Sequence, residues 1–314
     1  MRKALAILAF ALAACTDTPD KRIALTYDDA PLGDGPSMSG DERTAALIDQ
    51  WEKADTGPVA IFVTTKGMDT DSGQARIRAY ADAGHLIANH SDTHPWASQL
   101  DVEAYLADID TAEAKLDGLP NRRAWFRFPF LDEGGYGEDR DAARNRRDAL
   151  RAGLSERGLM SGYVTVDTYD WHLDRLWKGA VTSNRPVDMD ALEATYVAMV
   201  VDAAEHYDLL AQQALGRRPT QVLLLHENDL AAHFTEAAVD GLRQAGWEII
   251  SPDTAFADPI AGSEPQTLFS GMGRVAAMAS DTGLTGAEVF DHWSASETDI
   301  TERAQALGAF GDSQ

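Results

Sequence analysis

Two histidines and two adjacent aspartates are the residues of this sequence whose types and spacing best fit metal chemistry. His90 and His94 are four positions apart, and Asp28 and Asp29 follow one apolar run. One carboxylate and two imidazoles form a common catalytic zinc shell that leaves positions for water and substrate. Both rings can face one point when the backbone between them turns helically. We therefore expect Asp29, His90 and His94 to bind a divalent cation.

The other aspartate of the pair has a separate role in this interpretation. When Asp29 binds the cation, Asp28 is free to accept a proton from water whose pKa the cation has lowered. Arg127 supplies the positive charge that would keep Asp28 ionised. The structural alternatives are a helix cap for Asp28 and a plain salt bridge for Arg127.

His226 is the candidate for a general acid. It ends a very apolar run, so its ring should emerge at the rim of a sheet. A carboxylate at Asp170 or Asp167 would hold the ring protonated, ready to donate to a leaving amine. Trp171 and Leu224 would form an apolar wall for a small group such as a methyl, and ordinary core packing is compatible with the same two residues.

These residues follow apolar β-type runs that alternate with helical patterns. The strand candidates are 23–27, 59–64, 86–89, 124–128, 163–166, 221–225 and 247–251. The helix candidates are 41–54, 74–83, 102–116, 139–157, 189–215 and 235–245. Such alternation implies a parallel sheet with crossover helices, either closed into a barrel or left open. The carboxyl ends of parallel strands meet at one rim, which would bring the candidate residues together.

Two segments depart from this alternation. Residues 172–220 form a long connection that contains the helix candidate 189–215, and we expect this connection to restrict the substrate groove. Residues 257–314 do not continue the alternation of strand and helix patterns. We expect them to pack against the barrel or to form a partly mobile extension, with a short helix at 300–307.

The first residues have the pattern of a targeting signal rather than of a folded element. Arg2 and Lys3 precede an apolar run that is too short to span a bilayer, as in a secretory signal. The residues that end in Cys15 resemble the lipobox of bacterial lipoproteins, whose cysteine is acylated. We therefore expect a signal peptide at 1–14, lipidation of Cys15 and a tether at 15–21.

The residue after the cysteine bears on location. Thr16 stands where an aspartate would resemble an inner-membrane retention signal, so we favour an outer-membrane lipoprotein that faces the periplasm. A plain secretory signal with an incidental cysteine is the alternative. In the lipoprotein interpretation, the lipid anchor is the only contact with a membrane that we expect.

The overall composition narrows the range of partners. The chain has 314 residues, with 27 Lys and Arg against 51 Asp and Glu, which gives a formal net charge of −24. Because phosphate contacts need clustered Lys and Arg, this excess of acid argues against nucleic acid or an anionic membrane surface as a partner. A content of 44% hydrophobic and 25% charged residues is that of an ordinary globular protein. The single cysteine excludes an intramolecular disulfide framework.

Five short motifs closely resemble, in order, those of the polysaccharide deacetylase family, the NodB-homology enzymes of carbohydrate esterase family four. They lie at 26–31 (TYDDAP), 90–94 (HSDTH), 127–130 (RFPF), 167–171 (DTYDW) and 224–226 (LLH). We expect residues 22–256 to form the catalytic domain. Two positions depart from the family pattern, because Ala30 stands in place of a glycine and Phe130 in place of a tyrosine.

The resemblance implies an α/β fold, a distorted (β/α) barrel of about seven parallel strands, here with a long helical insertion at 172–220 and a C-terminal extension. It implies a divalent metal bound by Asp29, His90 and His94, with zinc preferred and cobalt, manganese or nickel as alternatives. The base would then be Asp28.

The resemblance also implies roles around the reacting group. Arg127 would orient the base, and His226, supported by Asp170, would be the acid. The acetyl group would lie between Trp171 and Leu224. In the family, the backbone N–H that corresponds to that of Phe130 stabilises the oxyanion.

The expected function is that of a secreted, lipid-anchored, metal-dependent deacetylase that removes acetyl groups, above all the N-acetyl group of an amino sugar, from an acetylated polysaccharide or oligosaccharide. The sequence leaves open the glycan, the choice between N- and O-deacetylation, the native metal and the oligomeric state.

Three alternatives accompany this expectation. A related hydrolase of small cyclic amides or ureides would work in the cytoplasm, which conflicts with the expected secretion. A catalytically silent glycan-binding lipoprotein would have little reason to retain Asp28 and His226. A mononuclear Fe(II) oxygenase can also use two histidines and a carboxylate, but its ligands normally lie on a β-sandwich with a different spacing.

Overall fold

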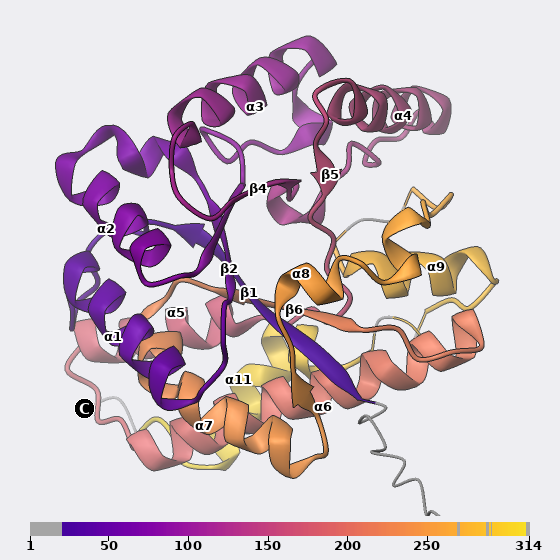
Figure 1. The fold of residues 1–314 in the computed structure, drawn as a ribbon. Helices are drawn as coiled ribbons and strands as arrows, with labels where there is room; N and C mark the ends of the chain where they lie inside the picture. Colours follow the sequence, from indigo (N-terminus) through magenta and orange to yellow (C-terminus); the bar gives the residue numbers. More distant parts are fainter. Residues whose placement is uncertain (1–20, 269–270, 287–288, 290, 312–314) are drawn as a thin grey trace, which may run out of the picture.

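The computed structural model describes residues 21–268, 271–286, 289 and 291–311. The predicted signal peptide and Cys15 lie outside these residues. A seven-stranded sheet forms the centre of the described chain, and its strand pairs are parallel (Figure 1). The strand order is β5-β4-β3-β2-β1-β6, and β7 pairs with β1. The strands are β1 (Arg22–Ala30), β2 (Ala60–Val63), β3 (Leu86–Asn89), β4 (Arg122–Phe126), β5 (Met160–Ser161), β6 (Gln221–His226) and β7 (Glu248–Ile249).

Helices connect the strands and surround the sheet (Figure 1). They are α1 (Gly40–Lys53), α2 (Asp71–Asp82), α3 (Val102–Leu116), α4 (Arg140–Glu156), α5 (Asp170–Thr182), α6 (Met189–Leu215), α7 (Asp229–Gln244), α8 (Pro252–Ala255), α9 (Gly273–Asp281) and α11 (Glu297–Ala306). A helix follows each of the first four strands, so the alternation predicted from the sequence, and with it the α/β class, is confirmed.

Most helix bounds agree with the prediction, and the differences have local causes. The bounds of α3 and α6 are those predicted. α7 begins at Asp229, ahead of the predicted start, because Asn228 caps its first turn by accepting a hydrogen bond from the Ala231 N–H. α5 was missed, since it begins inside a motif and no capping side chain marks its start.

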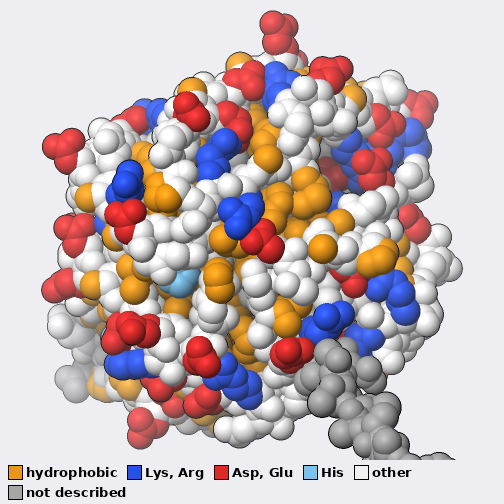
Figure 2. Space-filling model, viewed as in Figure 1, with side chains coloured by type: hydrophobic (Ala, Val, Ile, Leu, Met, Phe, Trp, Pro, Cys, Tyr) orange, Lys and Arg blue, Asp and Glu red, His pale blue; other side chains and the backbone are white. Residues whose placement is uncertain are grey.

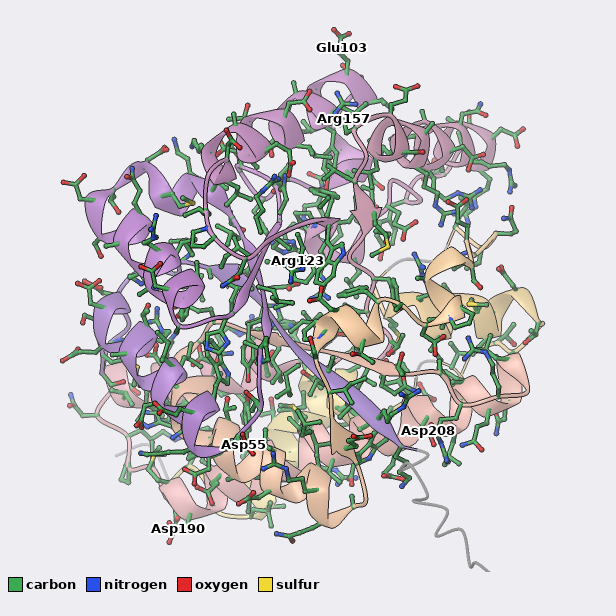
Figure 3. The ribbon with its side chains drawn as sticks, in the orientation of Figure 1. Asp55, Glu103, Arg123, Arg157, Asp190 and Asp208 are labelled. Atoms are coloured by element: carbon green, nitrogen blue, oxygen red, sulfur yellow. The ribbon has the colours of Figure 1, made fainter. Side chains whose placement is uncertain are left out.

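On one face of the molecule (Figure 2), charged side chains of both signs are dispersed. On the face shown in Figure 2, Asp and Glu side chains alternate with Lys and Arg. Glu103 of α3 and Asp190 of α6 point away from the molecule (Figure 3). Among the helices of the described residues, none is both long and apolar enough to cross a membrane.

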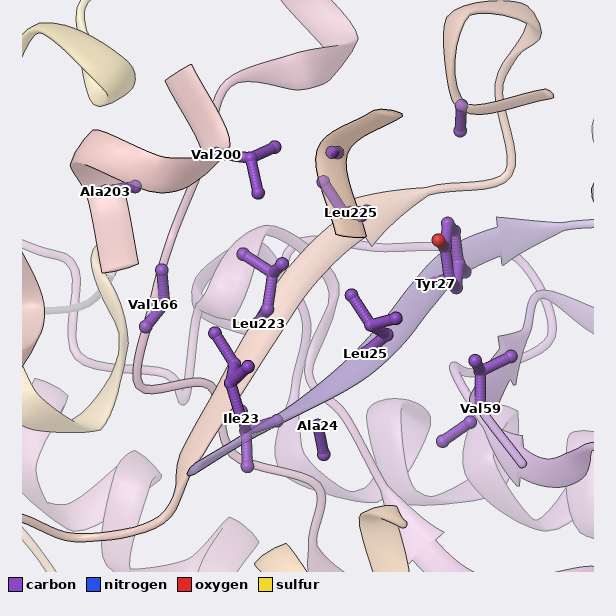
Figure 4. Packing of buried hydrophobic residues seen from close by; sticks show 14 of the residues in the cluster. Ile23, Ala24, Leu25, Tyr27, Val59, Val166, Val200, Ala203, Leu223 and Leu225 are labelled. Atoms are coloured by element: carbon purple, nitrogen blue, oxygen red, sulfur yellow. The ribbon is translucent and has the colours of Figure 1, made fainter. Parts of the chain in front are cut away.

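In the two central strands, β1 and β6, successive side chains point to opposite faces of the sheet, because the side-chain period of a strand is two residues. In β1 the side chains that pack toward the helices are those of Ile23, Leu25 and Tyr27. Figure 4 shows these residues near Leu223 and Leu225 of β6. The intervening residues Thr26 and Asp28 both accept hydrogen bonds from Arg127, which fills the interior of the barrel. This alternation aims Asp28 at the inside.

The helix α6 belongs to the core. Its side chains with no exposed surface include Tyr196, Met199, Val200, Ala203 and Tyr207. Figure 4 shows Val200 and Ala203 facing Leu223 of β6, and the helix also packs against α7 and α9. Removal of this helix would therefore remove a large part of the core.

The strand predicted at 163–166 is wrong. Only Val166 pairs with a strand, through a single bridge to Leu223 of β6. The segment leaves β5 at one edge of the sheet and reaches β6 at the other, where Val166 accepts a hydrogen bond from the Leu224 N–H (3.0 Å). Because it crosses between the two edges, it closes the barrel without running alongside one neighbour.

The described part of the C-terminal segment packs on the barrel. α9 lies against α6, and α11 contacts both α5 and α6. Trp293 donates its indole N–H to Asp202 of α6 (3.0 Å). Glu297, at the start of α11, accepts a hydrogen bond from Arg175 of α5 (2.6 Å). The segment thus reaches the end of the barrel where the candidate residues lie.

Candidate active site

A cavity of about 570 Å³ lies at the carboxyl ends of the strands. Its lining residues are Asp28, Asp29, His90, His94, Trp96, Phe130, Leu131, Tyr136, Asp167, Tyr169, Trp171, Leu224, His226, Gly271 and Glu297. Eight of the predicted site residues are among them. The other two, Arg127 and Asp170, lie directly behind the cavity and contact Asp28 and His226 respectively. The five motif segments therefore meet at one rim, as the sequence predicts, although the segment before Asp167 is not a strand.

Asp29, His90 and His94 are arranged as metal ligands. One ligand atom of each lies within 4.8 Å of the others. Asp29 Oδ1 is 3.0 Å from His94 Nε2 and 3.5 Å from His90 Nε2. His90 Nδ1 lies 2.9 Å from the backbone oxygen of Arg127, so Nδ1 carries a proton and Nε2 is the nitrogen directed at Asp29.

The protonation and hydrogen bonding of Asp29 also fit a cation. Its buried Oδ1 atom lacks a hydrogen bond of good geometry, which leaves an acceptor that a cation would satisfy. Burial alone would raise the pKa of Asp29, but the imidazoles of His90 and His94 outweigh it and hold the pKa well below its ordinary value. The three residues present thus suit a divalent ion.

Left-handed backbone conformations bring the three ligands together. The pairing of β1 with β2 shifts register after Tyr27, and Asp29 has φ of 69°. This turn rotates Asp29 to the same side as Asp28, although consecutive strand residues normally point apart. Ala30 lies outside the left-handed region, which explains why alanine is accepted in place of glycine.

The loop that carries the two histidines differs from the prediction. The expected helical turn is wrong, because Ser91 (φ 71°) and His94 (φ 57°) are left-handed and the loop is irregular. The two rings nevertheless meet edge to face, with centroids 5.0 Å apart. Asn89 holds the loop by accepting the Ser91 N–H (2.7 Å), and the Ser91 hydroxyl accepts the His94 N–H (3.0 Å). Such local strain is typical of functional sites.

Asp28 is paired with Arg127 inside the barrel. Arg127 Nη1 donates to Asp28 Oδ1 (2.6 Å) and to the Thr26 hydroxyl (2.8 Å), and its Nε donates to the Gly162 carbonyl (2.6 Å). The guanidinium carbon lies 3.8 Å from the centroid of the Phe62 ring. Both members of the pair are almost fully buried. Removal of either would leave an unpaired buried charge, at a cost of about 3–5 kcal/mol.

His226 is held on the opposite side by Asp170. His226 Nδ1 lies 2.6 Å from Asp170 Oδ1, and the other carboxylate oxygen accepts the backbone N–H of His226 and the amide of Asn228, each at 2.9 Å. Burial alone would lower the pKa of His226, but Asp170 raises it to about 10. Of the two carboxylates considered from the sequence, Asp170 is the one that binds the ring. Burial raises the pKa of the other, Asp167, to about 8.

Aromatic residues that the sequence reasoning missed line the cavity. Trp96 stacks on Phe130 with ring centroids 4.0 Å apart and planes 4° apart. The Phe130 ring in turn meets His94 edge to face at 4.5 Å, and Tyr136 meets Trp96 at 5.9 Å. The position of Trp96, two residues after the second histidine, is the signal that could have found it. Across the cavity, Tyr169 lies 5.2 Å from Trp171.

The segment expected to restrict the groove does not line the cavity. None of the described residues in 172–220 is among the lining residues. The C-terminal segment supplies Gly271 and Glu297 instead. The expectation placed a long connection over the rim, but this one buries an apolar face against the sheet.

The comparisons with known proteins agree with the motifs. The family model for polysaccharide deacetylases matches residues 16–146, a span that contains the first three motifs. The motifs at 167–171 and 224–226 lie beyond this span, and the structure brings them to the same cavity. None of the curated proteins compared with the chain matches it significantly.

Solved structures support the fold. The chitin deacetylase of the fungal pathogen Colletotrichum lindemuthianum is 19% identical, with a TM-score of 0.50 over 75% of this chain and 87% of that one. A polysaccharide deacetylase of Bacillus cereus is also 19% identical, with a TM-score of 0.50 over 74% of this chain and 91% of that one. The predicted NodB-like barrel is thereby confirmed.

The family model places residues 16–146 with the hydrolases that act on non-peptide carbon–nitrogen bonds. More narrowly, this span is similar to the polysaccharide deacetylases, the NodB-homology enzymes of carbohydrate esterase family four. The resemblance predicted from the five motifs is confirmed.

Proposed function

We propose that this protein is a metal-dependent deacetylase that hydrolyses the N-acetyl group of an amino sugar within a glycan. The proposal rests on one observation, which is that the two sides of a single cavity carry different chemical groups. Asp29, His90 and His94 form a cation site on one side, and the His226–Asp170 pair lies on the other. An amide between them would meet a nucleophile on one side and a proton donor on the other.

The base is Asp28. A divalent cation held by Asp29, His90 and His94, with zinc preferred, supplies Lewis-acid polarisation and lowers the pKa of water. Asp28 accepts the proton of the attacking water, and its pairing with Arg127 holds the receiving carboxylate in a fixed orientation. The acetamide carbonyl carbon then gains the new C–O bond.

The acid is His226. Its imidazolium, maintained by Asp170, donates a proton to the sugar nitrogen as the C–N bond breaks, so the products are acetate and a free amine. An amide nitrogen leaves only when protonated, whereas an ester oxygen needs less help. A histidine that Asp170 holds protonated meets this need of an amide, so we assign N-deacetylation.

Backbone and apolar groups complete the pocket. We assign oxyanion stabilisation to the backbone N–H of Phe130, which lines the cavity in a left-handed conformation (φ 58°). The hydroxyl that a tyrosine would bring there is absent. Trp171 and Leu224 form the wall for the acetyl methyl group. The stacked pair of Trp96 and Phe130 offers a flat apolar face to a sugar ring.

The charge of the cavity limits the glycan. Four carboxylates and three histidines line it, and its described lining residues include neither Lys nor Arg. The described lining thus offers no Lys or Arg that would bind the anionic groups of a polyanionic glycan, whereas a neutral or partly deacetylated one needs no such partner. Neutral amino-sugar polymers are therefore the substrate class that fits best.

The proposed location rests on the sequence. The pattern of residues 1–15 supports secretion and a lipid anchor at Cys15, and Thr16 favours the outer membrane of a two-membrane cell. The acetylated glycan would then be a polymer of the cell envelope or its surroundings. Retention of Cys15→Ser protein in the membrane fraction would contradict the anchor.

The decisive experiment measures acetate release from a panel of acetylated glycans, with and without a chelator. The native protein should release acetate from a neutral N-acetylated oligomer, lose this activity on chelation and regain it with zinc. Asp28→Asn should lose most of this activity, and added zinc should not restore it. Failure to release acetate from any glycan, with metal bound, would contradict the proposed function.

A further inference from the structure

A buried ion network lies behind the two sides of the cavity, and the steps described above do not use it. Its members are Arg43 of α1, Arg76 of α2, Glu227 after β6 and Asp229 of α7. All four are buried, and their two positive charges balance two negative ones. A network of this kind is a poor way to gain stability, because apolar residues of similar volume often serve equally well. Its retention calls for another role.

Glu227 is the centre of this network. Its Oε1 atom accepts hydrogen bonds from Arg76 Nη2 (2.7 Å) and the Tyr80 hydroxyl (2.8 Å). Its Oε2 atom accepts the backbone N–H of Leu32 (2.7 Å), and Arg43 lies 3.8 Å away. Every one of these neighbours is a donor, so the carboxylate is matched to its ionised form.

The same network also forms hydrogen bonds to the backbone just after Asp28 and Asp29. Arg76 Nη1 donates to the Leu32 carbonyl (2.7 Å), and Arg43 Nη1 donates to the carbonyls of Leu32 (3.1 Å) and Gly33 (3.0 Å). Leu32 is thus held at both its N–H and its carbonyl. It follows Asp29 by three residues, so its position limits how the turn at Asp28 and Asp29 can move.

Glu227 also contacts that turn through its backbone. Its N–H donates to the carbonyl of Asp28 (2.9 Å), while its side chain binds Leu32. The residue before it in sequence is the acid His226. One buried residue therefore touches the chain before and after Asp29 and continues directly into the general acid.

We propose that Glu227 is a positioning residue that fixes the turn carrying Asp28 and Asp29 relative to His226. This inference rests on the proposed function for the identity of the base, the cation site and the acid. Glu227 touches neither the cavity nor the predicted ligands, and it acts through Leu32 and the Asp28 carbonyl. It would set both the affinity of the cation site and the distance between base and acid.

The test compares Glu227→Gln with a matched control. A glutamine must present an amide N–H to Leu32 or to Arg76 and Tyr80, so at least one donor loses its acceptor. The control is Asp208→Asn on α6, labelled in Figure 3, where a buried carboxylate pairs with Arg218 (2.8 Å) and neither residue lines the cavity. Tyr80→Phe removes one hydrogen bond from an uncharged donor to Glu227 and serves as the milder variant if Glu227→Gln does not fold.

The primary readout is the affinity for zinc alone, measured by competition with a chromophoric chelator. Loss of a residue that orients metal ligands indirectly typically weakens metal binding by about 10–100-fold, which we expect for Glu227→Gln, with a smaller loss for Tyr80→Phe. The visible spectrum of the cobalt-loaded protein should change in the same variants. In acetate release, kcat should fall while KM changes little. Asp208→Asn should lower thermal stability and leave zinc affinity and the spectrum unchanged.

The outcomes separate the two claims. If the native protein binds zinc, Glu227→Gln binds it less tightly and no glycan is deacetylated, the positioning inference stands and the proposed function fails. If the native protein releases acetate and folded Glu227→Gln or Tyr80→Phe matches it in zinc affinity, spectrum and kcat, the inference is overturned. Equal losses in Glu227→Gln and Asp208→Asn would also overturn it.

Discussion

The two sides of the cavity use the same residue types in opposite ways. On the metal side, His90 points its Nδ1 at a backbone carbonyl, which leaves Nε2 free to bind a cation beside Asp29. On the acid side, His226 points its Nδ1 at the carboxylate of Asp170, which raises the pKa of the ring to about 10. At this site a neutral acceptor accompanies the proposed metal ligand, whereas an ionised acceptor accompanies the proposed proton donor.

The comparison shows that the group that accepts a hydrogen bond from Nδ1 influences which chemical role the imidazole ring can take. Neither histidine could be assigned from its own type or exposure, because both lie at the ends of buried strands. The two sides of the cavity can therefore be tested by separate variants. Variants on the metal side should change metal content, and variants on the acid side should change the pH profile.

The largest effect is expected from removal of a proposed metal ligand. His90→Ala leaves a carboxylate and one imidazole, which is too few protein ligands for a catalytic zinc site. Zinc content after dialysis and acetate release should both fall to background. His233→Ala, which replaces an exposed histidine of α7 outside the cavity, should change neither. Full zinc content in purified His90→Ala would contradict the proposed ligand set.

Asp28→Asn should give the next largest effect and should separate the base from the metal site. The substitution removes the proton acceptor and leaves Asp29, His90 and His94 in place. General-base catalysis contributes typically about 10²–10⁴-fold, so kcat should fall by that factor. Zinc content should stay that of the native protein. A variant with native kcat would exclude Asp28 as the base.

Asp170→Asn should change the acid side through its pH dependence. Because the pKa of His226 is raised to about 10, the rate should fall only as the pH rises through that value. Without the carboxylate, the pKa returns toward 6.5, so the alkaline limb should move to lower pH and the loss should be largest above pH 8. By linkage, the stability from this raised pKa is complete below about 6.5 and is lost as the pH rises toward 10.

The control for this profile is Asp174→Asn. Asp174 is another buried carboxylate of α5, and it accepts backbone N–H groups of α7 without touching His226. It should lower stability without moving the alkaline limb. A limb that stays in place in Asp170→Asn would show that His226 does not act as the acid.

The contrast between the two sides also shows what the sequence could predict. Strand ends were predictable from apolar runs, and this was enough to bring Asp29, His90 and His226 to one rim. The conformations that aim the ligands were not, because left-handed φ at Asp29 and His94 leaves no mark in residues other than glycine. The choice of Asp170 over Asp167 likewise needed coordinates, since both follow the same apolar run.

Longer-range features were harder still. The segment 172–220 is long enough to form a lid. The apolar side chains of its helix α6, however, are buried in the core. Glu297 lines the cavity from a segment without any motif, held there by Arg175 of α5. Glu227, next to a motif histidine, shows no sequence sign of its contacts with Arg43 and Arg76. Such contacts depend on which helices the barrel brings together.

The smallest effects are expected from substitutions of the aromatic residues on the two sides of the cavity. Trp96→Ala removes the ring that stacks on Phe130 on the metal side. An aromatic contact of this kind is worth about 0.5–1.5 kcal/mol, so KM for an oligosaccharide should rise roughly 3–10-fold with little change in kcat. Trp171→Ala, on the acid side, should instead lower kcat, because its ring borders the acetyl group. If both variants changed only KM, the acetyl pocket would not lie against Trp171, and the reacting amide would have to be placed nearer the Trp96 face.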